Sequence, residues 1–263
     1  MDIKDHIKHY RDEYHTGREI DAASINHHRI FLKRIDGYLT SGRGLIALDL
    51  GCDLGQFQPA LSERFDLVLA ADISATAAKK AAAMCPNSAG VCLDGERGVP
   101  FGNSSLDAIF AFGVLEHMHN PEAAISEFNR VLKPSGTLVM LQLYRLDDWA
   151  ILYEKINRLR RRDAAGRATR EDLHISQYRP AQWVKSVSDY GFELQARVAT
   201  SVLPPLYYIG DTRFGPLRAM GNYLRMNFYN LPVLSFLDRG LCRIRLVANL
   251  AALGFIFVFR AAK

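Results

Sequence analysis

Hydrophobic and polar positions follow two alternating spacings along the middle of the chain. Short apolar runs alternate with segments in which apolar residues recur every three or four positions. The runs predict five strands, at residues 45–50, 66–73, 90–93, 106–112 and 137–143. The segments between them predict helices, with Ser74 and Asn120 as N-caps. Strands that alternate with helices are typical of a parallel sheet covered on both faces.

A helical pattern precedes this alternation and a less regular one follows it. Ile3, Ile7, Tyr10 and Tyr14 recur at helical spacing near the N-terminus. Later residues predict a helix over 179–190 and strands over 192–198 and 254–260. We therefore expect an α/β fold, a doubly wound, Rossmann-like seven-stranded sheet with added helical parts. The expected parts are a helical N-terminal extension (1–44), a core (45–201 and 246–263) and an inserted helical cap (202–245).

The composition excludes several classes of protein. The chain has 263 residues, of which 49% are hydrophobic and 23% charged, so it is too apolar to be disordered. Its four cysteines contain no CxxC pair, which argues against a disulfide scaffold and a cysteine-rich zinc site. The first residues are charged and lack the apolar stretch of a signal peptide, so we expect a cytoplasmic protein.

The net charge of +5 is unevenly distributed along the chain. Residues 1–150 hold 15 Lys and Arg against 20 Asp and Glu, whereas residues 151–263 hold 18 against 8. The basic second half either faces an anionic substrate or membrane surface, or is a solvated cationic face. The longest apolar run, residues 246–259, contains Asn249 and is shorter than the roughly 20 residues of a spanning helix, which favours a place in the core.

A glycine-containing loop follows the first predicted strand. In Leu-Asp-Leu-Gly-Cys-Asp-Leu-Gly, residues 48–55, Gly51 permits a tight turn and a close approach of ligand to backbone. Asp72 ends the next strand, where an acid can accept hydrogen bonds from ribose hydroxyls. The G-x-G-x-x-G pattern of dinucleotide sites is absent, and Asp49 suits a cationic cofactor better than a pyrophosphate.

These segments resemble the class I S-adenosylmethionine-dependent methyltransferases, in particular the type 11 family that acts on small molecules. LDLGCDLGQF resembles the first motif of the family and AADIS its ribose-binding segment. Residues 93–140 resemble its third to fifth strands almost continuously. The resemblance covers about 100 residues, 45–143, and rests on four segments in order at normal spacing. It implies S-adenosyl-L-methionine as cofactor and methyl transfer by in-line displacement.

The resemblance also implies roles for single residues. The methionine part of the cofactor would be surrounded, mostly by backbone groups, by Asp49, Gly51, Cys52 and Gly55. Asp72 would bind the ribose hydroxyls, and Ile73 would pack against the adenine. The polar edge of the adenine would meet Asp94 and Gly95, and the methyl-transfer site would be bordered by Phe112 and Gly113.

Asp53 departs from the family pattern, which usually has glycine at this position. Aspartate tolerates unusual backbone angles better than most residues. Its charge either favours the ammonium group of the cofactor or crowds its carboxylate. We expect binding to survive and Asp53→Gly to bind the cofactor equally or more tightly.

His117, after the fourth strand, is the candidate catalytic residue. With an ordinary pKa near ~6.5 it can accept a proton from a hydroxyl acceptor. Alternatively, it only shapes the pocket or caps the next helix. His117 and His119 have no evident third ligand, so we predict no metal site. His174 and Tyr178 are weaker candidates near the acceptor.

The acceptor is indicated only by class. Phe112-Gly113-Val114-Leu115 stands where amino-methylating nucleic-acid enzymes carry a [DNS]-Pro-Pro-aromatic motif, which disfavours a nucleic-acid acceptor. Aromatic residues and Arg213, Arg218 and Arg225 in the predicted cap suit a small-molecule, sugar or lipid-linked acceptor with an anionic group, methylated at oxygen, unless the cap is simply packed. Basic segments could also contact anionic lipid. The alternatives are a non-catalytic S-adenosylmethionine-binding protein and, less favoured, a nicotinamide-dependent oxidoreductase.

Overall fold

The computed structural model describes residues 7–15, 17–20, 22–142, 178–202, 216, 219–220, 223 and 231–263. The chain divides into two compact units. The first comprises Met1–Gln142, Ile175–Val198 and Ile256–Lys263, and the second Leu143–His174 and Ala199–Phe255. The arginine-rich segment 153–170, His174 and residues 203–215 and 224–230 of the predicted cap lie outside the described residues.

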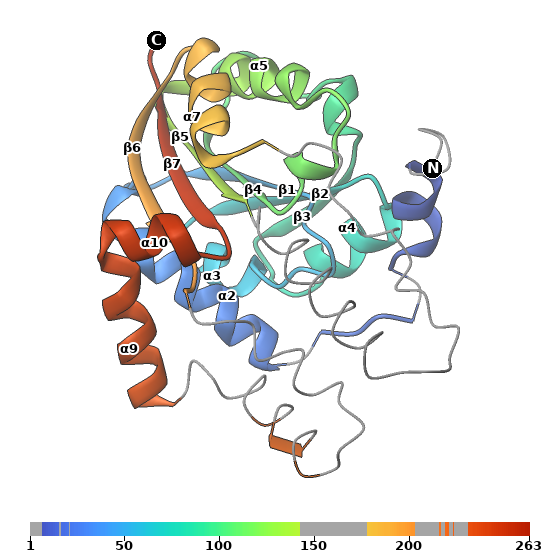
Figure 1. Cartoon of the computed structure of the whole chain (residues 1–263). Helices are drawn as coiled ribbons and strands as arrows, with labels where there is room; N and C mark the ends of the chain where they lie inside the picture. The colour runs from blue at the N-terminus through green and yellow to red at the C-terminus, as the bar shows by residue number, and fades with distance from the viewer. Residues whose placement is uncertain are drawn as a thin grey trace, which may run out of the picture. The chain divides into compact units, whose positions relative to one another are not determined.

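A seven-stranded sheet forms the centre of the first unit (Figure 1). Its order is β3 (Ser88–Cys92), β2 (Leu67–Asp72), β1 (Ile46–Leu50), β4 (Leu106–Phe112), β5 (Leu132–Gln142), β7 (Phe255–Ala261) and β6 (Phe192–Ala199). Strands β1 to β5 pair in parallel. Backbone bonds from Thr200 to Gly254 and from Ala262 to Gly191 make β6 and β7 antiparallel. The predicted seven-stranded Rossmann-like sheet is confirmed.

The burial of each strand follows its place in the sheet. All seven residues of the central strand β4 are buried, consistent with its apolar sequence Leu-Asp-Ala-Ile-Phe-Ala-Phe. Strand β3, at the edge, has the small residues Ser-Ala-Gly-Val-Cys and exposes three of its five positions. The central strands therefore carry the core and hold the loops at their ends in place.

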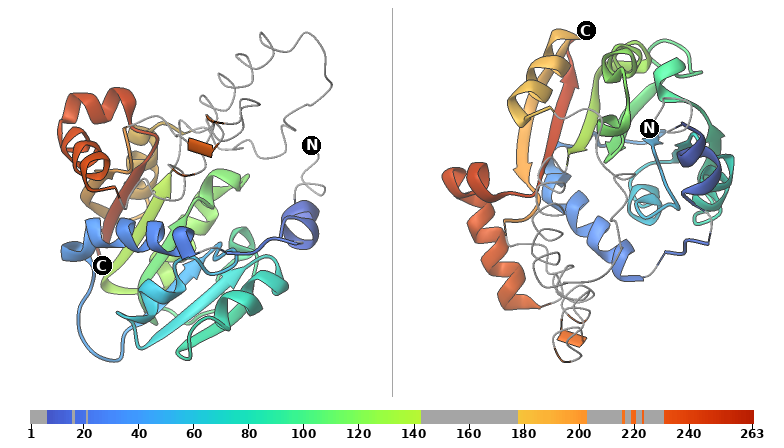
Figure 2. Two further views of the ribbon diagram at one scale, coloured as in Figure 1. Left: turned by 90° about the horizontal axis from the view of Figure 1, so that it is seen from below. Right: turned by 45° about the vertical axis from the view of Figure 1, so that its right-hand side comes forward.

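Helices flank the sheet in the first unit. They are α2 (Ala22–Ile35), α3 (Gln58–Ser62), α4 (Ala75–Ala82), α5 (Pro121–Val131) and α7 (Pro180–Asp189), with the short turns η1 (His9–Glu13), η2 (Asp36–Tyr38), η3 (Gly95–Arg97) and η4 (Leu115–His117). Figures 1 and 2 show α5 and α7 side by side on one side of the sheet, with α2 and α3 on the other. The predicted N-caps are confirmed, because Ser74 accepts from the backbone of Ala77 and Asn120 from that of Ala123.

Two expectations differ from the structure. Strand β5 begins at Leu132, which pairs with Leu106, and not at the predicted Thr137. Residues 134–136 lie inside the strand, where Ser135 has a φ of 59° and the register with β4 shifts. The apolar run 246–259 belongs to α10 (Arg245–Ala251) and β7, and Leu246 and Leu250 are exposed, not buried.

The second unit contributes two described helices, α9 (Pro232–Arg243) and α10. Among the described residues, no helix is both long and apolar enough to cross a bilayer.

Candidate functional site

The loops after β1, β2, β3 and β4 form one rim, because parallel neighbouring strands end at the same edge of the sheet. Their first residues remain bonded to the adjacent strands. Cys52 donates its backbone N–H to the carbonyl of Ala71, and Leu93 donates to Asp72, each over 3.0 Å. Gly113 donates likewise to Leu141. The sheet therefore fixes the backbone of the loops in which the candidate residues lie.

Gly51 is required where two of these loops meet. Its φ is 68°, in the left-handed region that favours glycine. A Cβ atom at this position would lie 2.7 Å from a side-chain methyl of Val114. The first loop thus approaches the loop after β4 more closely than any other residue type would permit.

A cavity of about 220 Å³ lies at this rim. It brings together eight of the residues predicted for the site: Gly51, Asp72, Ile73, Asp94, Gly95, Phe112, Gly113 and His117. These residues come from four separate loops. The assignment of individual roles to them stays a prediction, since the cavity shows their proximity and not a bound cofactor.

Three predicted residues do not line the cavity. The Asp49 carboxyl is 1% exposed and accepts a hydrogen bond of 2.8 Å from the Gln58 amide. Burial raises the pKa of Asp49 to about 7. Cys52 is buried against Ala70 and Ala81, and burial raises the pKa of its thiol, which argues against a nucleophile. Cofactor contacts from these residues would therefore come from the backbone.

Gly55, the third of these residues, belongs to the packing of the loop. Its φ is 97°, and a Cβ atom there would lie 2.8 Å from Ala81 Cα and from the sulfur of Met84. The absence of a side chain lets the loop pack closely on α4.

Asp72 is held by the backbone of two loops. One carboxylate oxygen accepts from the N–H of Ser74 over 2.9 Å and the other from the N–H of Asp53 over 3.1 Å. The side chain lines the cavity although the residue is only 6% exposed. These two bonds orient the carboxylate toward the space where the prediction places the ribose.

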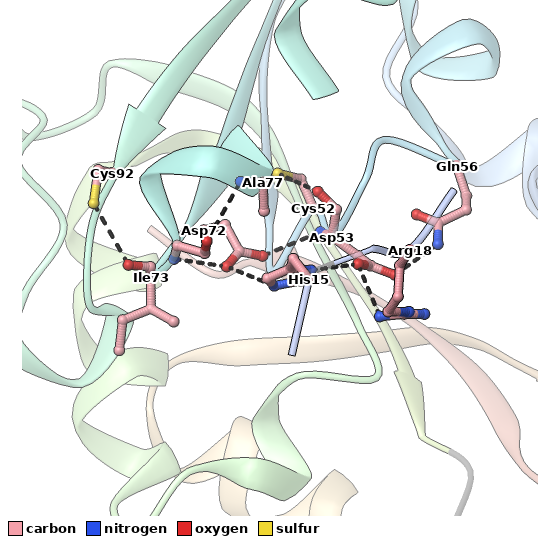
Figure 3. A network of polar contacts seen from close by, with 10 residues as sticks. His15, Arg18, Cys52, Asp53, Gln56, Asp72, Ile73, Ala77 and Cys92 are labelled. Atoms are coloured by element: carbon pink, nitrogen blue, oxygen red, sulfur yellow. Dashed lines mark hydrogen bonds and ion pairs between the residues drawn. The ribbon is translucent and has the colours of Figure 1, made fainter. Parts of the chain in front are cut away.

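Asp53 has a left-handed backbone, with a φ of 46°. Its carboxylate faces His15 and Arg18 of the N-terminal segment and accepts from the Gln56 amide (Figure 3). The His15 ring lies between two carboxylates, with Nδ1 2.8 Å from Asp53 and Nε2 3.6 Å from Asp72. The sequence pattern gave no sign of this contact, because residues 35 positions or more apart meet only in the folded chain.

His117 lies beside a tyrosine of the N-terminal segment. Its Nδ1 is 3.2 Å from the Tyr10 hydroxyl, and both residues line the cavity. The capping role considered for His117 is taken by Asn120, whose side chain caps α5. His119 also lines the cavity. Tyr178 donates to Glu122 over 2.6 Å and is not among the residues that line this cavity.

The N-terminal segment supplies a wall that the sequence analysis missed. Ile7, Tyr10, Tyr14 and His15 all line the cavity. The helical spacing of Ile7, Tyr10 and Tyr14 was the available signal. That spacing indicates an apolar face but not what it covers.

The charges around the cavity select between the two cofactor classes. Four carboxylates line it, from Asp53, Asp72, Asp94 and Glu96. These four carboxylates outnumber the cationic His15 in the lining, and the remaining negative charge attracts a sulfonium and an ammonium group and repels a pyrophosphate. No G-x-G-x-x-G loop is present to offset that repulsion. The residues therefore fit S-adenosylmethionine and do not fit a nicotinamide dinucleotide.

Comparison with known proteins agrees with this geometry. Residues 48–140 match the family described as a methyltransferase domain. They form a class I S-adenosylmethionine-dependent methyltransferase domain. The matched range begins in β1 and ends in β5, and it includes every rim loop described above. S-adenosylmethionine is the cofactor of this methyltransferase domain.

Solved structures share the fold at low identity. The [4+2]-cyclase SpnF matches with a TM-score of 0.57 and 18% identity over 95% of this chain and 86% of its own. A methyltransferase-like protein of Bacillus halodurans matches with a TM-score of 0.56 and 16% identity, over 88% of this chain and 99% of its own. An S-adenosylmethionine-dependent methyltransferase of Mesorhizobium loti matches with a TM-score of 0.53 and 16% identity, over 87% of this chain and 96% of its own. No curated protein matches the chain.

Proposed function

We propose that this methyltransferase domain transfers a methyl group to the oxygen of a small-molecule, sugar or lipid-linked acceptor. The observation that carries the proposal is the acidic cavity, in which Asp72 faces the same space as His117. When bound, S-adenosylmethionine supplies an activated methyl group together with its leaving group. The chain must then align the acceptor and accept its proton.

His117 and Tyr10 suit the proton-accepting role. If Nδ1 of His117 carries a proton and donates it to the Tyr10 oxygen, Nε2 is left as the basic nitrogen. Tyr10 then orients the ring and fixes the tautomer. A general base of this kind contributes about 10²–10⁴-fold to the rate.

Cofactor binding is tested first by calorimetry with S-adenosylhomocysteine. We expect the parent protein to bind it and Asp72→Asn to weaken binding by about tenfold or more, because one charge-assisted contact to the ribose is lost. Asp189→Asn removes an exposed carboxylate on α7 and is the matched control. Absence of binding by the parent would contradict the proposal.

Methyl transfer is tested by incubating labelled S-adenosylmethionine with fractionated extracts and identifying the labelled product by mass spectrometry. The readout must be the transferred methyl group itself, because SpnF is named as a cyclase and shares the fold. We expect His117→Ala to lower kcat by about 10²–10⁴-fold with little change in cofactor affinity. If the variant instead raised KM for the acceptor and left kcat nearly unchanged, the role of His117 would be to shape the acceptor pocket.

The exposed face of α9 and α10 supports a lipid-linked acceptor. Outward positions of these helices carry Val233, Phe236, Leu237, Ile244, Leu246 and Leu250, each at least 49% exposed. Polar Ser235 and Asp238 are buried on the opposite face of α9, and Asp238 accepts from the Ser201 hydroxyl. This arrangement inverts the usual amphipathic pattern of a surface helix.

The charges beside this apolar face favour an anionic bilayer as its partner. Arg239, Arg243 and Arg245 are exposed there, and the only acid in residues 231–251 is the buried Asp238. Two copies meeting through this face would bring arginines together without acids to pair them. Apolar side chains flanked by arginines instead suit insertion into an interface of anionic lipid.

Vesicle flotation tests this docking. We expect the protein to float with phosphatidylglycerol vesicles, less so in high salt, and not with phosphatidylcholine vesicles. The double variant Phe236→Ser/Leu237→Ser should lose binding, whereas Tyr190→Ser, an exposed aromatic of the first unit, should retain it. Equal binding by the double variant, or a change in its oligomeric state alone, would reject the membrane partner.

A further inference from the structure

The cavity is closed by two parts of the chain that are far apart in sequence. The loops of the sheet rim form one wall, and the N-terminal segment, defined here as the described residues between 7 and 20, forms another. Polar contacts join the two walls, among them those of Tyr10, His15 and Arg18 of the segment. Those from His15 and Arg18 converge on Asp53 (Figure 3).

Asp53 has contacts at both of its carboxylate oxygens, and those at Oδ1 come from the N-terminal segment. Oδ1 lies 2.8 Å from Nδ1 of His15 and 3.2 Å from Arg18, and Oδ2 accepts from the Gln56 amide over 2.7 Å. Position 53 has a φ of 46°, in the left-handed region. Glycine would adopt this backbone with less strain, and asparagine would adopt it without a charge. One carboxylate oxygen is therefore bound to the N-terminal segment, and the other is held by Gln56 of its own loop.

The two carboxylates at the rim need a cation between them. Asp53 and Asp72 are adjacent, since the N–H of one donates to the carboxylate of the other. Burial by itself would lower the pKa of His15, but the Asp53 and Asp72 carboxylates raise it to about 9. The charged His15 and Arg18 lower the pKa of Asp53 against the opposing effect of burial. Two cations of the segment thus neutralise two carboxylates of the rim.

We propose that Asp53 and His15 form a latch that holds the N-terminal segment closed over the cofactor, with His15 as a positioning residue for Asp72. This inference rests on the proposed function and adds to it a control of cofactor affinity. Opening the segment removes Tyr10, Tyr14 and His15 from the cavity. It also leaves the adjacent carboxylates of Asp53 and Asp72 without the cations of the segment. A bound cofactor must therefore wait for the latch to open before it leaves.

The latch changes the expectation for position 53. From the sequence alone, the Asp53 carboxylate is only a neighbour of the cofactor, and Asp53→Gly is expected to bind the cofactor equally or more tightly. Because one oxygen of this carboxylate is bound to His15 and Arg18 in the structure, we now expect Asp53→Gly and Asp53→Asn to bind more weakly.

Cofactor affinity and dissociation test the latch at pH 7. We expect Asp53→Asn and His15→Gln each to weaken binding of S-adenosylhomocysteine by about tenfold, mainly through faster dissociation. The loss in the double variant should be smaller than the sum of the two single losses, since both changes remove the pair between Asp53 and His15. Glu13→Gln removes an exposed carboxylate from the same segment and should bind as the parent does. Unchanged or tighter binding by the single variants would overturn the latch, and tighter binding would indicate that His15 competes with the ribose for Asp72.

Hydrogen exchange without cofactor separates the latch from the proposed function. In the parent we expect amides of residues 7–20 to exchange more slowly than in Asp53→Asn, while those of β4 are unchanged. Identical exchange of the segment in both proteins overturns the latch. Failure of the parent to bind S-adenosylhomocysteine, with the exchange difference intact, overturns the proposed function and leaves the latch standing.

Discussion

Two titratable groups near the site are held far from their ordinary behaviour by opposite causes. Asp49 is fully enclosed beside Gln58, and burial disfavours its charged form. His15 is nearly as enclosed, but the two carboxylates beside it favour its charged form. At the scale of single residues, burial therefore sets the charge of Asp49 and neighbouring carboxylates set that of His15.

Stability should change with pH through Asp49. Its pKa is raised from 3.8 to about 7 in the folded protein, so the favourable contribution of the neutral form is complete below about pH 4 and is lost as pH rises through 7. Asp49→Asn stays neutral and should be more stable than the parent at pH 8, by up to roughly 4 kcal/mol. The two proteins should converge near pH 4 in urea unfolding; a pH-independent difference would contradict the assignment.

Cofactor affinity should change with pH through His15. Its pKa is about 9 with the segment closed and near ~6.5 when the segment is open, so the latch is complete below pH 6.5 and lost as pH rises through 9. Binding of S-adenosylhomocysteine should weaken by about tenfold between pH 7 and 9.5.

His15→Gln provides the control for this pH profile. The variant retains Asp53, Asp72 and Arg18, which face the ring, as well as the Tyr14 ring and the more distant Asp49. Its binding should be nearly flat over the same range. An equally steep profile in the variant would assign the dependence to one of those groups.

At the scale of elements, short helices depend on their caps for a defined start. Helix α4 has eight residues, five of them alanine, and its N-cap is Ser74. The Ser74 hydroxyl accepts a hydrogen bond from the backbone N–H of Ala77. Ser74 follows Asp72, whose carboxylate lies at the rim, by two positions. The cap thus fixes the helix start and the adjoining loop together.

Removal of this cap should destabilise the fold modestly. We expect Ser74→Ala to lower the free energy of unfolding by about 1 kcal/mol, because one N–H of the first helical turn loses its partner. Thr76→Ala, an exposed change in the same helix, should be neutral or slightly stabilising because alanine favours helix. Chemical denaturation at one pH measures both. Equal effects of the two changes would contradict a capping role.

At the scale of the whole molecule, the acidic rim decides which ligands stabilise the folded state. A ligand that binds only the folded chain adds about 2.7 kcal/mol at a concentration of 100 times its Kd. We expect S-adenosylhomocysteine to raise Tm and NADH to leave it unchanged, since carboxylates outnumber cations in the cavity lining and the net negative charge repels a pyrophosphate. A rise in Tm with NADH alone would favour the oxidoreductase alternative.

The sequence by itself determined the strands, their alternation with helices and the rim residues. Short apolar runs such as Leu106–Phe112, bounded by helical segments and turn residues, predict buried strands, and Gly51 and Asp72 then lie at strand ends. Local patterns suffice here because parallel strands place their carboxyl ends together. This is why eight predicted site residues line one cavity.

Only the tertiary structure decided how the N-terminal segment and Asp53 are used. The contact of His15 with Asp53 and Asp72 joins residues that no spacing rule relates. The late start predicted for β5 and the core position predicted for Leu246 were wrong for the same reason. Hydrophobic periodicity shows which face of a segment is apolar, whereas the surface it meets depends on contacts between distant parts of the chain.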